Sequence, residues 1–124
     1  MIDHLSLGSH RYTEAVAFYR RVLAPLGVEL QRDTGAEAAF GSELHWCFFL
    51  YPAEARDAVL GKGTHLAWRA PSRAVVEAVH AEALAAAGSD LFTPRQRPDI
   101  SATYFGAMFT DLDGHRIEVK TDAG

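Results

Sequence analysis

Residues 63–71, GTHLAWRAP, place a histidine inside a short run in which apolar side chains alternate with others. Successive residues of a β-strand point to opposite faces, so Leu66 lies on one face and His65 on the other. The stretch IDHLSLG, residues 2–8, places His4 at the equivalent position, 61 residues earlier. The two stretches therefore predict two strands that each carry a histidine opposite their apolar face.

The similarity extends along the chain, which reads as two copies of one pattern. In each copy the strand leads through a polar turn into an amphipathic helix, expected over about 13–26 before Gly27 and over about 73–87 before Gly88. Ser72 is a candidate N-cap of the second helix. Three β-like runs follow each helix. These runs are 28–32, 36–40 and 45–51 in the first copy and 90–93, 104–110 and 115–121 in the second.

This order predicts an α+β fold built from two tandem βαβββ modules, about 1–52 and 64–124, with a linker over 53–63. We expect one domain over 1–124, since 124 residues are enough to bury a core without disulfides or metals. The modules would form a curved, barrel-like mixed sheet around a cleft, with one helix of each module on the outside. The polar, proline-containing stretch 93–102 is expected to be a long loop.

The composition is that of an ordinary soluble protein, with 48% hydrophobic and 23% charged residues and a formal net charge of -4. No Lys/Arg-rich stretch offers a surface for nucleic acid. The single cysteine, Cys47, fits a reducing compartment. No apolar run approaches the length of a membrane span, and the chain opens without a signal-peptide pattern. We therefore expect a cytoplasmic protein with no nucleic-acid or membrane partner.

Strand phase also places a carboxylate with the two histidines. In the last strand Ile117 and Val119 share one face, and Glu118 lies on the other. If the apolar faces pack on the helices, then His4, His65 and Glu118 share the opposite side. Two imidazoles and a carboxylate suit Fe(II), Mn(II), Zn(II) or Ni(II) and leave coordination positions open. The alternative is that each of these polar side chains simply faces water.

Four stretches resemble the vicinal-oxygen-chelate superfamily, which joins glyoxalase I, extradiol dioxygenases, fosfomycin-resistance thiol transferases and bleomycin-binding proteins. They are IDHLSLG, AVAFYRRVLAPLGVEL, GTHLAWRAP and YFGAMFTDLDGHRIEV, and DLDGHRIE is the most specific element. The resemblance implies paired βαβββ modules around a metal cleft, with His4, His65 and Glu118 as ligands. It also implies a homodimer, and in some members the cleft forms across two chains.

The chain departs from parts of this family. Aligning HWCFFLY with HRIEVKT sets Phe48 against Glu118, at the position where glyoxalase I-like members carry a fourth ligand. Phe48 neither binds a metal nor accepts a proton, so glyoxalase-type isomerisation is not expected to be the activity. The ending KTDAG lacks the arginine of the thiol transferases. Bleomycin-binding relatives lack the ligands that this chain keeps.

The resulting hypothesis is a metal-dependent enzyme with one divalent ion (Fe, Mn, Zn or Ni) that chelates a small oxygenated metabolite. Lyase, isomerase and dioxygenase chemistry all remain open, and thiol transfer is a further option. The alternative is a metal-free or non-catalytic protein that binds a drug or another small molecule in the same cleft.

Further residues are candidates for the substrate cleft. Trp46 and Phe48 are candidates for an apolar wall, with core packing as the alternative. Tyr104 is a candidate donor of a hydrogen bond or proton to a metal-bound oxygen, and Arg69 a candidate contact for an anionic group. The remaining histidines are not expected to be ligands, and His80 is expected on the exposed side of its helix.

Overall fold

The computed structural model describes residues 1–124 and contains the same order of elements twice. The first module has β1 (Leu5–Ser9), α1 (Tyr12–Val22), the 3-10 turn η1 (Ala24–Leu26), β2 (Glu29–Asp33), β3 (Ala38–Gly41) and β4 (Trp46–Pro52). The second has β5 (His65–Arg69), α2 (Arg73–Ala85), β6 (Ser89–Gln96), β7 (Phe105–Thr110) and β8 (Arg116–Thr121). The predicted order of two βαβββ modules is confirmed.

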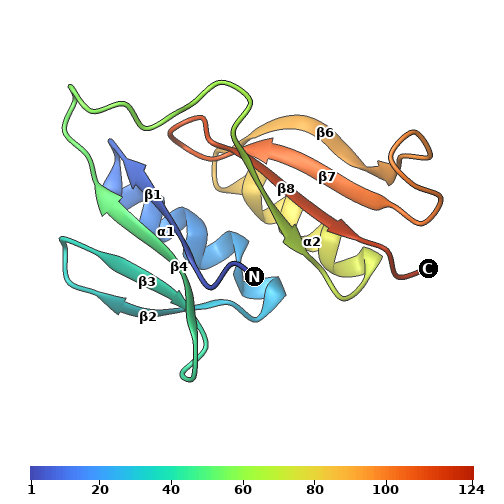
Figure 1. The fold of residues 1–124 in the computed structure, drawn as a ribbon, viewed down its shortest axis with the longest axis horizontal. Coiled ribbons are helices and arrows are strands. Elements are labelled where there is room, and N and C mark those ends of the chain that lie inside the picture. Colours follow the sequence, from blue (N-terminus) through green and yellow to red (C-terminus); the bar gives the residue numbers. More distant parts are fainter.

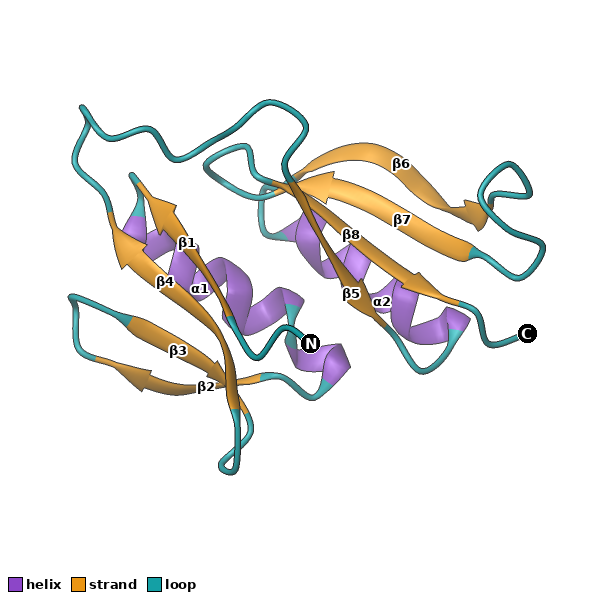
Figure 2. Ribbon diagram, viewed as in Figure 1, coloured by secondary structure: helices purple, strands orange, loops and turns teal.

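Each module forms its own four-stranded mixed sheet, and Figure 1 shows the two sheets beside one another. The strand order is β1-β4-β3-β2 in the first sheet and β5-β8-β7-β6 in the second. The first strand of each module runs parallel to the last, and the remaining pairs are antiparallel. Both helices lie on the same side of the sheets, behind them in the view of Figure 2. The predicted α+β class is therefore confirmed, although the sheets do not close into a barrel.

The face of each sheet that carries the helix forms one continuous apolar core. Nineteen buried residues from both modules belong to this cluster, and Ile117 and Val119 of β8 are fully buried in it. Leu7, Leu66 and Trp68 pack against it from β1 and β5. These are the side chains that the alternation of the strands assigns to the helix side. The opposite face of each sheet, here called the outer face, carries no helix.

A set of polar contacts ties the two modules together at one end of the core. The Tyr19 hydroxyl of α1 donates to Asp111 Oδ2 at 2.5 Å, and the Ser9 hydroxyl donates to Asp113 at 2.5 Å. Nε2 of the buried His115 lies 2.9 Å from the carbonyl oxygen of Gly8. The turn between β7 and β8 therefore fixes the second module to the first.

The first helix is shorter than the predicted range of 13–26. It ends at Val22, because Pro25 cannot continue an α-helix and the chain passes into η1. Gly27 then takes the left-handed conformation, with φ 74°, as its sequence position predicts.

The second helix begins as predicted but ends differently. Ser72 accepts the Val75 amide proton at 3.2 Å and is the N-cap. At the other end Ala87, not Gly88, takes the left-handed φ of 75°. A Cβ on Gly88 would lie 2.7 Å from the carbonyl oxygen of Thr110, so this glycine is required for close packing instead.

Two further expectations are wrong. The predicted loop 93–102 begins later, because β6 continues through Pro94 to Gln96. A proline is tolerated there since β6 is an edge strand with shifts in its register. His80 is buried rather than exposed, with Nε2 2.7 Å from Asp90 Oδ1. No helix of the structure is both long enough and apolar enough to cross a membrane.

Candidate functional site

The candidate site lies on the outer face of the second sheet, where β5 and β8 run side by side. Their parallel register pairs Leu66 with Ile117 on the core side and Ala67 with Glu118 on the outer side. His65 precedes Ala67 by two positions and therefore shares the outer face with Glu118. The two side chains meet, with His65 Nε2 3.4 Å from Glu118 Oε1.

Tyr104 is the third member of a cluster that also contains His65 and Glu118. Its hydroxyl donates to Glu118 Oε2 at 2.8 Å, so the two oxygens of Glu118 face different partners. Tyr104 is 2% exposed, whereas the His65 side chain is 47% exposed. Burial raises the pKa of the Tyr104 phenol well above its usual value, and the adjacent Glu118 carboxylate raises it further. At neutral pH the phenol therefore keeps its proton and acts as a donor.

Gly106 makes the position of Tyr104 possible, and sequence reasoning did not single it out. A Cβ at Gly106 would overlap the Tyr104 hydroxyl oxygen and lie 2.6 Å from ring atom Cζ. The tyrosine ring thus folds back over the backbone two residues further on and reaches Glu118 on β8. Only a residue without a side chain leaves this space.

His4 lies apart from the other two predicted ligands. It precedes β1 at the edge of the first sheet, and its Nδ1 is 2.8 Å from Asp3 Oδ1. Its ring packs edge-on against Phe49, with 5.4 Å between the ring centroids. Within one chain no three His, Cys, Asp or Glu side chains converge in a way that could hold a metal ion. The structure therefore brings His65, Glu118 and Tyr104 together but not His4.

The register of β4 corrects the alignment that placed Phe48 opposite Glu118. Phe48 pairs with Leu5 of β1, just as Ile117 pairs with Leu66 of β5. Phe48 is therefore the counterpart of Ile117, and Phe49 is the counterpart of Glu118. A difference of one residue along a strand transfers a side chain to the other face of the sheet.

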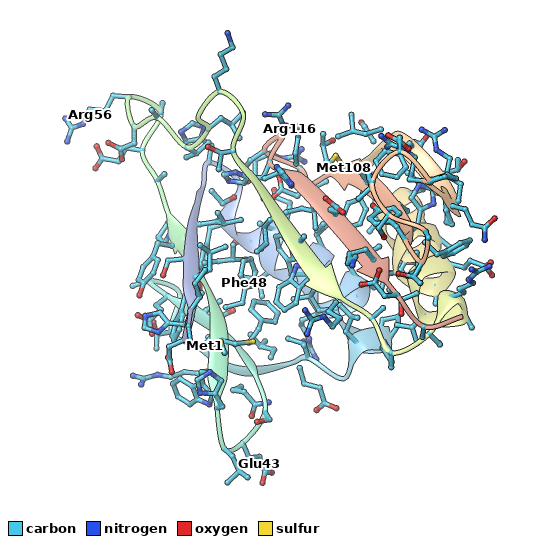
Figure 3. The ribbon with its side chains drawn as sticks, turned by 45° about the vertical axis from the view of Figure 1, so that its right-hand side comes forward. Met1, Glu43, Phe48, Arg56, Met108 and Arg116 are labelled. Carbon is cyan, nitrogen blue, oxygen red and sulfur yellow. The ribbon has the colours of Figure 1, made fainter.

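The packing of Phe48 agrees with this register. It is fully buried, 4.9 Å from the Tyr19 ring and 5.7 Å from the Trp68 ring between centroids, and Figure 3 labels it in the interior. Phe48 is thus a core residue and not a wall of the outer face. The position equivalent to Glu118 is occupied by Phe49, which also provides no metal ligand.

The other two candidates for the substrate cleft are at least partly accessible. Trp46 is half-buried at the start of β4, where it pairs with Gly41 across a register shift. Arg69 is exposed at the end of β5, beside Lys120 and on the same face as His65. Arg69 forms no ion pair with a carboxylate at hydrogen-bond distance, so its charge is available to a ligand.

Comparison with known proteins identifies the family. The Glyoxalase/Bleomycin resistance protein/Dioxygenase superfamily matches residues 1–119, and the chain belongs to this superfamily. No match is found among curated protein sequences.

Solved structures with the same fold share little sequence with this chain. A glyoxalase/bleomycin resistance protein from Albidiferax ferrireducens T118 has a TM-score of 0.84 at 21% identity, covering 96% of this chain and 97% of that one. A glyoxalase/bleomycin resistance protein/dioxygenase family enzyme from Burkholderia phytofirmans PsJN has a TM-score of 0.75 at 14% identity, covering 98% of each chain. The fosfomycin resistance protein FosX from Listeria monocytogenes has a TM-score of 0.71 at 16% identity, covering 98% and 92%.

Proposed function

We propose that this protein is a divalent-metal-dependent enzyme that acts on a small oxygenated metabolite. The observation that carries the proposal is the pairing of His65 and Glu118 on an open sheet face, with Tyr104 on the second oxygen of the same carboxylate. The candidate reactions are those of lyases, isomerases and dioxygenases, with thiol transfer as a further candidate.

The spacing of the two side chains fits a metal ion. Two ligands of one tetrahedral or octahedral ion, each bound at about 2.1 Å, lie roughly 3.0–3.4 Å apart. His65 Nε2 and Glu118 Oε1 are 3.4 Å apart. An imidazole nitrogen and a carboxylate oxygen are also a donor pair that Fe(II), Mn(II), Zn(II) and Ni(II) accept.

The third ligand in the proposal is His4 of the partner subunit in a homodimer. Within one chain His4 stays on the first sheet beside Phe49, and no cavity of the chain is lined by Glu118 or Tyr104. A second copy that packs the outer face of its first sheet over this site would supply the missing imidazole and enclose the face. A two-fold axis would create two identical sites.

The roles of the residues follow from their chemistry. A bound divalent ion would act as a Lewis acid toward two neighbouring oxygens of the substrate. His65 and Glu118 would hold that ion. The Tyr104 phenol, protonated at neutral pH, orients Glu118 and is the nearest proton donor to the site. Phe49 lies on the outer face of the first sheet, at the position equivalent to Glu118. In the proposed dimer this face packs over the site, so the apolar ring would limit the access of water from that side.

A second candidate function is binding without catalysis. The observation that favours it is that a single chain brings together only two potential ligands, so a monomer would have at most an incomplete metal site. In that case the outer face would bind a small molecule without a metal, as the bleomycin-resistance part of the family name suggests.

Metal titration separates the two functions. Manganese(II) binding to the apo-protein, followed by electron paramagnetic resonance, should be tight for the wild type and lost for His65→Ala and for Glu118→Ala. His10→Ala is the control, because His10 is exposed and contacts only the carbonyl oxygen of Asp57 through its ring. Equal binding by the wild type and both site variants would eliminate the metal site.

Mixed dimers test the source of the third ligand. Chains carrying His4→Ala and chains carrying Glu118→Ala should each fail to bind manganese(II) alone. If His4 comes from the partner subunit, each mixed dimer keeps one intact site, so an equal mixture regains about a quarter of all sites. If the ligands come from one chain, the mixture regains none.

A further inference from the structure

Basic side chains gather on the outer face of the second sheet, although the chain as a whole has a net charge of -4. Five of its 12 basic residues lie on this face or at its rim. They are Arg69, Arg95, Arg97, Arg116 and Lys120, and Figure 3 labels Arg116 at one end of the sheet. A positive face on an acidic protein attracts anions and raises their local concentration.

Arg95 is the cation of this group that the protein holds in place but does not neutralise. Its guanidinium carbon lies 4.8 Å from the Phe92 ring centroid, and it forms no ion pair. Arg97 also stacks on Phe92, at 5.2 Å, but its guanidinium donates to both Asp99 carboxylate oxygens at 2.9 and 2.6 Å. Lys120 is paired with Asp122. Arg95 therefore keeps its N–H donors free.

The stacking determines what those donors can bind. A guanidinium that lies on an aromatic ring is restricted in its rotation, and its free N–H groups point outward in the plane of the fork. This geometry matches the two oxygens of a carboxylate, which accept a pair of parallel hydrogen bonds.

Met108 and the ring of Tyr104, which folds over Gly106, provide carbon atoms between Arg95 and the candidate metal site. Met108 of β7 pairs with Glu118 on one side and with Phe92 on the other, so its side chain lies between the two on the same face. β6 and β8 are two strand spacings apart, which is about 10 Å between backbones. A ligand that reaches from Glu118 to Arg95 would thus place several carbon atoms over Met108.

We propose that the substrate carries a carboxylate group on an apolar body and that Arg95 binds this carboxylate. The inference rests on the proposed function, because the chelating oxygens of the same molecule would lie near His65 and Glu118. The carboxylate is then a substituent remote from the reacting oxygens, and Arg95 determines specificity rather than chemistry. Phe92 positions the guanidinium.

The test uses metal-free protein, so that its result is independent of the metal site. Benzoate, the neutral isostere benzamide, and inorganic phosphate are titrated at constant ionic strength while the amide signals of Gly106 and Met108 are followed by NMR. Benzoate should bind with saturating shifts, and benzamide and phosphate should each bind about tenfold more weakly or not at all. Arg95→Gln should weaken benzoate binding about tenfold or more.

Arg20→Gln is the matched control, since Arg20 is exposed on α1, on the opposite side of the molecule, and has no ion pair. It should leave benzoate binding unchanged. If Arg95→Gln and Arg20→Gln weaken benzoate binding equally, the effect comes from the total charge of the protein and not from Arg95, and the proposal is overturned. If benzamide binds as tightly as benzoate, the carboxylate charge does not contribute to binding and the proposal is wrong. If phosphate binds as tightly as benzoate, the apolar body does not contribute and the proposal is wrong as well.

Discussion

At the scale of single residues, the site depends on one hydrogen bond and on the space that permits it. Tyr104 donates to Glu118 at 2.8 Å, and this contact requires the absence of a side chain at Gly106. Donors to a ligand carboxylate fix its orientation toward the metal. Tyr104 is therefore a positioning residue for Glu118, independent of any later role in proton transfer.

Replacing Tyr104 by phenylalanine should weaken manganese(II) binding about 10- to 100-fold without abolishing it, because the carboxylate remains but loses its donor. Gly106→Ala should have a similar effect, since the added methyl group displaces the tyrosine ring. Tyr12→Phe is the control, because Tyr12 on α1 donates to the Asp33 carboxylate in a similar pair away from the outer face of either sheet. Affinity of Tyr104→Phe equal to that of the wild type would contradict the positioning role.

At the scale of elements, helix ends and strand registers depart from simple patterns for local steric reasons. The end of α2 is an example, because an alanine adopts the left-handed conformation beside a glycine that does not. A Cβ added at Gly88 would lie 2.9 and 2.7 Å from the carbonyl oxygens of Ala83 and Thr110, so position 88 requires a glycine for close packing although its φ is not left-handed. The strain therefore stays at Ala87.

Ala87→Gly should raise the free energy of unfolding by about 1 kcal/mol, because an L-residue in the left-handed region is disfavoured by about 1–2 kcal/mol and part of this gain is offset by glycine entropy. Ala86→Gly is the control. Ala86 has a negative φ of -93°, so glycine there should lower stability by about 0.5–1 kcal/mol. Urea denaturation of both variants measures the two values, and a loss of stability in Ala87→Gly would contradict the assignment of strain.

At the scale of the whole molecule, a buried carboxylate links the modules. Asp111 Oδ1 accepts the amide protons of Asp113 and His115, each at 2.9 Å, and Oδ2 accepts the Tyr19 hydroxyl from the first module. Burial raises the pKa of Asp111, while the hydrogen bond from Tyr19 opposes that shift. The folded state therefore retains the Asp111 proton to a higher pH than the unfolded state does.

Tyr19→Phe should lower the free energy of unfolding at pH 7 by about 1–3 kcal/mol, because it leaves the buried carboxylate without one donor. It also raises the pKa of Asp111 in the folded state. When the pKa of a carboxyl group is higher in the folded state than in the unfolded state, the group destabilises the folded state increasingly as pH rises from the lower pKa to the higher one. The destabilisation should therefore be smaller at about pH 4 than at pH 7.

Urea unfolding at both pH values measures this difference. Tyr12→Phe is the control, since its hydroxyl donates to the exposed Asp33, and its effect should stay within about 0.5 kcal/mol. A Tyr19→Phe penalty that does not change with pH would show that Asp111 charge plays no part in it.

The sequence by itself determined the two βαβββ modules, the first turn of each helix and the side of β1, β5 and β8 that faces the core. These features depend on local periodicity and capping, which act over a few neighbouring residues. Alternation alone placed His65 and Glu118 on the face opposite Leu66 and Ile117. The grouping of His4 with them remains a prediction for the dimer.

Only the tertiary structure decided the register of β4, the reach of Tyr104 to Glu118 and the free guanidinium of Arg95. A register shift lies between Phe40 and Gly41, and a slip of one residue exchanges the two faces of a strand. It was the pairing with β1 that assigned Phe48 to the core and Phe49 to the outer face. Such pairings join residues distant in the chain, so their physical basis lies in contacts that no local pattern contains.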